Sequence, residues 1–235
     1  MLDVTLVSEN DYYIPDANKL VTEDDTPVDN FASEKQQRFL VNALYSSQAG
    51  QIFLAATNVG IFHTANQPAI VPDVFVSLQV QVPENWWEKS NRSYMIWHFG
   101  KPPEVVIEIV SNKVGNELGE KLHIYEQMRA SYYIVYDPNQ QLGESVLRIY
   151  ELRGMRYLET TQTWLEQVEL GLTLWEGEFE GRQDVWLRWC DAEGNILLTG
   201  DERATKAEIR ANTAEERAQI LAAQLRALGV EPDTL

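Results

Sequence analysis

Three ionisable residues stand where two apolar segments and a helix could bring them together. Asp73 opens one apolar segment, 71–76 (VPDVFV), and Glu108 interrupts another, 105–110 (VVIEIV). Lys121 follows on a stretch with helical spacing. Carboxylate oxygens are the ligands that Mg²⁺ prefers, and a lysine ammonium can orient an attacking water or stabilise developing charge. Two acids and a lysine in this order are the ingredients of a metal-dependent site that cleaves phosphodiesters.

Glu108 also has a purely structural interpretation. A carboxylate inside an apolar strand loses its hydration, and a metal ion or a positive side chain must offset that loss. A buried Glu108–Lys121 ion pair without any catalytic role would satisfy the requirement as well as a metal site would. The spacing of the residues leaves both interpretations open.

The core is expected to begin with a helix. Ser33, with Gln36 three residues later, has capping-box spacing and predicts the start of an amphipathic helix over 33–47. The apolar runs 51–56 and 60–63 flank a short polar stretch and predict a hairpin.

The two acids are expected on strands and the lysine on the helix that follows. Alternation over 72–82 predicts a half-buried strand, and 105–110 predicts a central strand covered on both faces. A helix is predicted over 116–128 and another strand over 132–136. The predicted buried face of this helix consists of Leu118, Leu122, Tyr125 and Met128. Glu117, Lys121 and Tyr125, spaced four apart, project along one line.

A long excursion, 83–100, separates two of these strands and carries several aromatic residues beside basic ones. Trp86 and Trp87 could stack on nucleobases. The simpler interpretation, which we favour at this point, is that the rings pin a long loop to the core.

The carboxy-terminal half is expected to add β structure. Segments 147–152 and 155–158 predict an antiparallel hairpin, and 184–190 predicts a short strand. Segment 164–175 is interrupted by Gly171, so irregular packing is expected there rather than a long element.

The end of the chain has a different pattern. Asp201 could cap a helix that runs to Gly229. Alternating three- and four-residue steps form a heptad seam of Ala204, Ala207, Ala211, Ala214, Ala218, Leu221, Leu225 and Leu228. A helix so thinly apolar is not expected to be stable alone, so it should pair with another copy, as a coiled-coil homodimer through 201–229, or lie on its own domain.

Composition bounds the class of protein. The 235 residues suffice for one sizeable domain with appendages, divided here into an acidic arm (1–30), a main domain (31–200) and a helical tail (201–235). One cysteine, no long apolar run and no secretory signal lead us to expect a cytoplasmic protein without a membrane span. A net charge of −17 argues against broad non-specific grip on nucleic acid, but a local metal ion could still face a phosphate.

Four motifs in order carry a resemblance to a known family. They are VPDV (71–74), EVVIEIVS (104–111), LGEK (118–121) with Tyr125, and YYIVYD (132–137). This set, within about 33–137, resembles the Uma-two family of restriction endonuclease-like proteins in the PD-(D/E)xK nuclease superfamily. The aromatic insertion and the helical tail resemble a long-form subgroup of it.

The resemblance implies an α/β (α+β) fold with a restriction endonuclease-like αβββαβ core, a mixed sheet, an extra β hairpin and a carboxy-terminal helix. It implies DNA as substrate and Mg²⁺, or Mn²⁺, as cofactor. Asp73 and Glu108 are then the metal-binding acids. The usual lysine would fall at Val110, so the catalytic role passes to Lys121, with Lys113 as runner-up.

Three further positions are weighed as additional site residues. Glu117 stands where the family often has Asp, and Tyr125 belongs to the third motif; Glu34 could add a carboxylate from the first helix, although an exposed acid favoured by the helix dipole is the simpler interpretation. Gln36 departs from the His that the family often has. The alternative to a nuclease is a non-catalytic module of the same fold that oligomerises through its tail and binds a protein partner.

Overall fold

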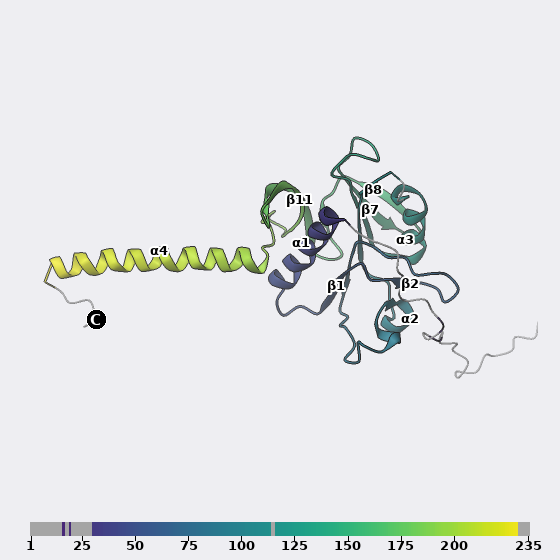
Figure 1. Ribbon diagram of the computed structural model, residues 1–235, viewed down its shortest axis with the longest axis horizontal. Helices are drawn as coiled ribbons and strands as arrows, with labels where there is room; N and C mark the ends of the chain where they lie inside the picture. Colours follow the sequence, from purple (N-terminus) through teal and green to yellow (C-terminus); the bar gives the residue numbers. More distant parts are fainter. Residues whose placement is uncertain (1–15, 17–18, 20–29, 114–115, 230–235) are drawn as a thin grey trace, which may run out of the picture.

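The computed structural model describes residues 16, 19, 30–113 and 116–229, so the acidic arm expected over 1–30 lies almost entirely outside the described residues. At the centre is a six-stranded sheet with strand order β1-β3-β5-β6-β7-β8 (Figure 1). β5 and β6 run parallel and the other neighbouring pairs run antiparallel, which makes the sheet mixed. The strands are β1 (Phe53–Thr57), β3 (Val74–Leu78), β5 (Val105–Ile109), β6 (Tyr132–Tyr136), β7 (Leu147–Arg153) and β8 (Arg156–Thr160).

The order of elements along the chain confirms the predicted αβββαβ core. It runs α1 (Phe31–Ser47), β1, β3, β5, α3 (Leu122–Met128) and β6. Shorter elements are inserted between these: β2 (Ile61–Phe62), η2 (Lys89–Asn91), β4 (Tyr94–Met95) and α2 (Ile96–Phe99). The hairpin predicted over 147–158 is also confirmed, as β7 and β8.

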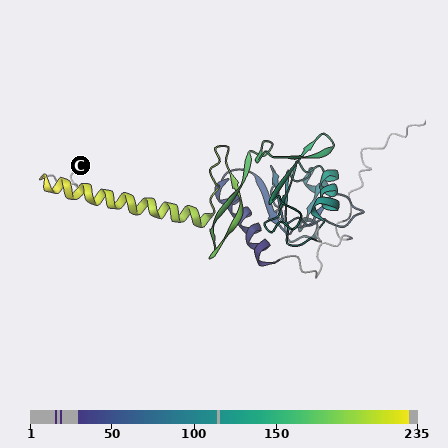
Figure 2. The same ribbon diagram turned by 90° about the horizontal axis from the view of Figure 1, so that it is seen from above.

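Helices and a second sheet cover the two faces of the central sheet. α1 packs on one face together with a three-stranded sheet of order β11-β10-β9, and α3 packs on the other (Figures 1 and 2). The second sheet contains β9 (Trp164–Leu165), β10 (Leu170–Phe179) and β11 (Arg182–Cys190). Every residue of β5 and β6 is therefore buried, as predicted for β5. The strand expected over 72–82 is confirmed as β3, but it is not half-buried, because Val74 to Ser77 are buried on both faces of the strand.

Two local expectations at the start of the core are wrong. Asn30, not Ser33, caps α1, since its side-chain oxygen accepts from the amides of Ala32 and Ser33 at 2.9 and 3.0 Å. The runs at 51–56 and 60–63 do not pair with each other. β1 pairs with β3, and β2 pairs in parallel with β4 from the aromatic excursion.

The irregular segment expected over 164–175 is also wrong, because ten residues from Leu170 form β10 and pair with β11. Gly171 does not break this strand. A side chain there would bring a Cβ to 2.5 Å from Cys190 Sγ, so the absence of one lets the two strands approach.

The carboxy-terminal helix α4 (Gly200–Ala227) extends away from the two packed sheets (Figures 1 and 2). Thr199, rather than Asp201, is its cap and forms a capping box with Glu202. Glu202 also accepts two hydrogen bonds, at 2.9 and 2.8 Å, from the buried Arg188 guanidinium, which lies over the Phe39 ring. The base of α4 is thus fixed to β11. No helix in the described part of the chain is long and apolar enough to cross a membrane.

Candidate active site

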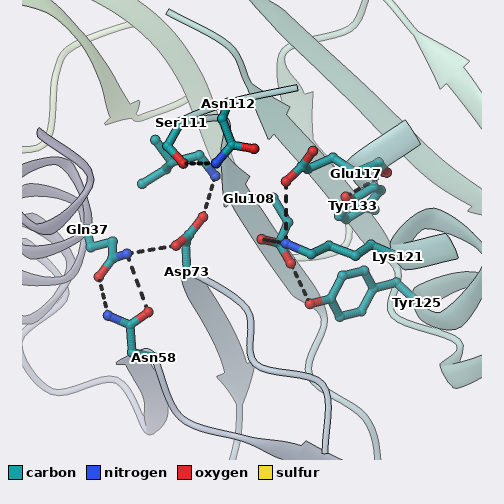
Figure 3. Close-up of polar contacts among 11 residues, drawn as sticks. Gln37, Asn58, Asp73, Glu108, Ser111, Asn112, Glu117, Lys121, Tyr125 and Tyr133 are labelled. Atoms are coloured by element: carbon teal, nitrogen blue, oxygen red, sulfur yellow. Dashed lines mark hydrogen bonds and ion pairs between the residues drawn. The ribbon is translucent and has the colours of Figure 1, made fainter. Parts of the chain in front are cut away.

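The two predicted acids occupy neighbouring positions at the ends of adjacent strands. Val74 pairs with Ile107 in the antiparallel β3–β5 register. Asp73 comes just before Val74 and Glu108 comes just after Ile107, so the two acids lie next to each other on adjacent strands. Figure 3 shows the two carboxyl groups near each other, with Asp73 hydrogen-bonded to Gln37 of α1 and Glu108 hydrogen-bonded to Lys121 and Tyr125. The structure therefore brings Asp73 and Glu108 together from segments 35 residues apart.

Glu108 is 2% exposed and has a partner on each carboxylate oxygen (Figure 3). The Lys121 ammonium donates to Oε2 at 2.9 Å, and the Tyr125 hydroxyl donates to Oε1 at 2.7 Å. Both donors come from the helical segment after β5, four residues apart, as their predicted alignment requires. The helical segment thus folds back over β5, which is the geometry that a catalytic role for Lys121 beside Glu108 requires. Lys113, the runner-up, is exposed in the loop after β5.

The helical segment begins with a π-helical turn, η3 (Glu117–Lys121), before α3. Asn116 precedes it at φ 58°, and a Cβ on Gly119 would lie 2.4 Å from the Asn116 side-chain oxygen, so a larger residue at 119 would have to displace the Asn116 side chain. The wider turn changes which side chains point inward. Glu117 is buried, whereas Leu118, predicted on the buried face, is 39% exposed.

Glu117 joins the cluster as a third acid. The Lys121 ammonium lies 3.4 Å from its Oε1, so the lysine bridges Glu117 and Glu108. Glu117 Oε2 is buried and has no hydrogen-bond partner among the described residues. The Tyr133 hydroxyl donates to the Glu117 carbonyl at 2.9 Å and fixes the start of the turn (Figure 3). A buried carboxylate oxygen without a partner is the kind of group that a bound cation or an ordered water satisfies.

The electrostatics of the cluster favour a neutral Glu108 when no metal ion is present. Burial, together with the nearby negative charge of Asp73, raises the pKa of Glu108 to about 8 against the opposing effect of Lys121. Burial alone would lower the pKa of Lys121, but the attraction of Glu108 and Glu117 outweighs it and raises that pKa. The lysine therefore stays charged, and Glu108 is the group that titrates.

Asp73 is held by residues that the sequence did not single out. The Gln37 amide donates to its Oδ1 at 2.8 Å, and the backbone amide of Ile109 donates to its Oδ2 at 2.6 Å. Asn58 in turn donates to the Gln37 side-chain oxygen at 2.9 Å. Gln37 lies on the buried face of α1. A polar residue on an otherwise apolar helix face was the feature of the sequence that could have pointed to it.

The other candidates on α1 lie elsewhere. Gln36 exchanges two hydrogen bonds with the backbone of Leu187, at 2.9 and 3.0 Å, and so ties α1 to β11. Glu34 pairs with Arg38 on the surface, at 2.8 Å, which agrees with the simpler interpretation of an exposed helix acid. The structure therefore does not bring Glu34 into contact with the Asp73–Glu108 cluster.

The cluster has a donor set that fits a divalent cation such as Mg²⁺. Within the described residues no group of three or more acidic, histidine or cysteine side chains is placed to hold a metal ion by itself. Mg²⁺, however, keeps several waters and is commonly bound through one or two carboxylates with substrate phosphate completing the shell. Asp73 and Glu108 supply that number, and their mutual repulsion is what such a cation would relieve.

Comparisons with known proteins show the family to which the chain belongs. A crystal structure described as "a putative nuclease belonging to DUF820 from Anabaena variabilis" is similar to the chain, with a TM-score of 0.41 and 14% identity over 59% of this chain and 72% of that chain. The chain matches no curated protein. Residues 20–177 match the model of the Uma2 family, which is described as "Putative restriction endonuclease". That match spans more than half of the sequence, and the chain belongs to the Uma2 family.

Proposed function

We propose that the chain is an endonuclease that hydrolyses DNA phosphodiester bonds with the help of a divalent cation, Mg²⁺ or Mn²⁺. The observation that carries the proposal is the convergence of Lys121 and Tyr125 on the buried Glu108 beside Asp73. Membership of the Uma2 family supports the same reaction class.

Each residue has a role that its contacts support. Asp73 and Glu108 would hold the cation, which when bound supplies Lewis-acid activation of water and neutralises phosphate charge. Gln37 and the Ile109 amide fix the Asp73 carboxylate. Tyr125 fixes Glu108. Lys121 keeps its positive charge at the cluster and would orient the attacking water or stabilise charge that develops on the phosphate.

Nicking of supercoiled plasmid with Mg²⁺ or Mn²⁺ tests the proposal. Asp73→Ala and Glu108→Gln should each lower the rate about 100-fold or more, because each removes a charged ligand. Glu120→Gln is the matched control, since Glu120 is an exposed acid next to Lys121 and should leave the rate unchanged. Absence of cleavage by the wild-type protein, or equal cleavage by Asp73→Ala, would overturn the assignment.

Two observations favour a second candidate, a non-catalytic module that assembles through α4 and binds a protein partner. All four oxygens of Asp73 and Glu108 already accept hydrogen bonds from the protein, and the chain carries a net charge of −17. A calorimetric titration with Mn²⁺ separates the two candidates. Absence of divalent binding in the wild type, with stable dimers that deletion of residues 201–235 abolishes, would favour the module.

A further inference from the structure

An aromatic pocket lies on the same face of the central sheet as the Glu108 side chain. Phe75 on β3 pairs in register with Val106 on β5, and Glu108 follows Val106 by two residues, so all three side chains lie on one face. Two residues along a strand span about 7 Å. Phe75 lines the pocket together with Leu54 and Ala56 of β1, and the pocket volume of about 490 Å³ is within the range of about 300–1,000 Å³ that is typical of small-molecule sites.

The floor of this aromatic pocket is rigid. Tyr94 is buried, and its hydroxyl lies 2.9 Å from Ser77 Oγ and donates to the Lys101 carbonyl at 3.0 Å. The Tyr94 ring stacks on Phe99, with centroids 4.3 Å apart and planes 7° apart. These contacts already attach the excursion at 83–100 to the core.

The rim of the pocket carries two tryptophans that contribute little to attaching the excursion to the core. Trp86 and Trp87 line the pocket yet are 56% and 78% exposed. Rings this exposed contribute little to pinning a loop, because most of their apolar surface still faces water. Arg92 also lines the pocket, and its Nε donates to the Trp87 carbonyl at 2.9 Å, which fixes the backbone that presents the ring. The rim thus offers two aromatic faces beside a positive charge.

We propose that the aromatic pocket binds one unstacked nucleobase of the strand that is cut at Asp73 and Glu108. This inference rests on the proposed nuclease function and adds that the DNA substrate must expose an unpaired base near the cleavage site. A chain with net charge −17 gains little affinity from phosphate contacts, so stacking must supply much of the grip on the substrate. Every base has a flat π-face, and Phe75 in the pocket lining lies two residues along the chain from Asp73, on the same face of the sheet as Glu108. Unpaired or single-stranded DNA is therefore the expected form of the substrate.

Binding measurements test the pocket separately from catalysis. Fluorescence anisotropy would follow a labelled single-stranded oligonucleotide, the same oligonucleotide with abasic sites, and a duplex, all with EDTA and about 0.2 M salt so that cleavage is absent and exposed charges are screened. The full-length wild type should bind the intact single strand at least about 5-fold more tightly than the abasic strand or the duplex.

Variants identify the residues responsible. Trp87→Ala should weaken binding of the intact strand about 5- to 100-fold, and Trp87→Phe should keep most of it, because a ring remains. Met155→Ala removes another exposed apolar side chain, from the β7–β8 turn, and should bind like the wild type. Trp86→Ala provides a second variant, and circular dichroism verifies that each protein is folded.

Several results would overturn the proposal: equal affinity for intact and abasic strands, no binding of either, or wild-type affinity in both Trp86→Ala and Trp87→Ala. Tryptophan burial that grows with protein concentration and is unaffected by oligonucleotide would also overturn it, since a second copy would then occupy the pocket. Base-dependent binding without any cleavage in Mg²⁺ or Mn²⁺ would reject the nuclease function and keep the pocket. If Trp87→Ala cleaves DNA at the wild-type rate and binding does not depend on the bases, the nuclease function is kept and the base-binding pocket is rejected.

Discussion

Lys121 and Glu108 form an ion pair between the start of a helical segment and a central strand, with the ammonium nitrogen 2.9 Å from Oε2. The Glu108 side chain is 2% exposed, whereas that of Lys121 is 29% exposed. The pair is therefore buried on the acid side and reachable by water on the lysine side. A buried ion pair is weak evidence for stability, because desolvation offsets much of the attraction. The exposed side of Lys121 supports the role that we propose for it at the substrate.

Replacing Lys121 should separate those roles. Lys121→Met leaves Glu108 with Tyr125 as its described side-chain donor, so we expect the rate of DNA cleavage to fall about 100-fold or more. The free energy of unfolding near pH 7 should fall by only about 1–3 kcal/mol, because the Glu108 carboxyl, whose pKa is raised to about 8, is already mostly protonated there and is not left as an unpaired charge. Plasmid nicking and urea unfolding measure the two quantities.

Lys113→Met is the control for this variant, since Lys113 is an exposed loop lysine close in sequence. It should match the wild type in both assays. A Lys113→Met protein that loses cleavage while Lys121→Met keeps it would transfer the catalytic role to the loop.

The raised pKa of Glu108 predicts an unusual dependence of stability on pH. The folded protein keeps the Glu108 proton up to about pH 8, whereas the unfolded chain releases it near 4.5. Between these values the folded state holds more protons, so its contribution to stability is present below pH 4.5 and is lost as the pH rises toward 8. Lys121, whose pKa is raised, keeps its contribution until the pH passes its usual value of 10.5, outside this window. Thermal unfolding without divalent ions should show the loss.

Glu108→Gln supplies the comparison, because an amide does not titrate. Its melting temperature should fall less between pH 5 and pH 8 than that of the wild type. With Mg²⁺ present, cleavage by the wild type should increase over the same interval as the carboxylate ionises and can bind the cation. Parallel stability profiles for the two proteins would exclude Glu108 as the titrating group.

Local patterns in the sequence predicted much of the central sheet. The apolar segment around Glu108 and the hairpin after β6 were found because burial on two faces and turn chemistry leave local signals. The partner of β1 was not found, since pairing between distant strands is decided by packing of the whole sheet. β10 was missed because Gly171 looks like an interruption locally, although it is a point of close approach to Cys190.

Some residues of the candidate site could also be predicted from the sequence, whereas others are identified only by the fold. Asp73, Glu108 and Lys121 carry charge and stand out in apolar or helical patterns, so they could be named from the sequence. Gln37 and Asn58 are uncharged, and only the fold shows that an amide on α1 reaches an acid 36 residues later. Glu117 could also be named, because it stands four residues before Lys121, but the π-helical turn that leaves Leu118 exposed is not predicted by ordinary helical spacing.

Gln37 should act as a positioning residue for Asp73. Gln37→Ala removes the donor to Oδ1, so affinity for Mn²⁺ should fall about 10- to 100-fold, as is usual for partners that orient metal ligands. Isothermal titration calorimetry measures this affinity. Gln36→Ala is the matched control: it removes the tie to Leu187, so it should lower stability and leave Mn²⁺ affinity unchanged. Equal Mn²⁺ affinities in Gln37→Ala and the wild type would remove Gln37 from the site.

The projecting helix α4 is predicted to pair with the α4 of a second copy. Its base is fixed by Arg188 and Glu202, but the seam from Ala204 to Leu228 is largely exposed, and a seam with heptad spacing is stabilised when another helix covers it. Leu221→Lys places a charge in the seam and should convert a dimer into a monomer in sedimentation equilibrium. Ile209→Lys places the same charge two residues before the seam position 211, on the opposite side of the helix, and should leave the dimer intact. A wild-type monomer at high concentration, or a dimer that survives Leu221→Lys, would show that α4 does not assemble the protein.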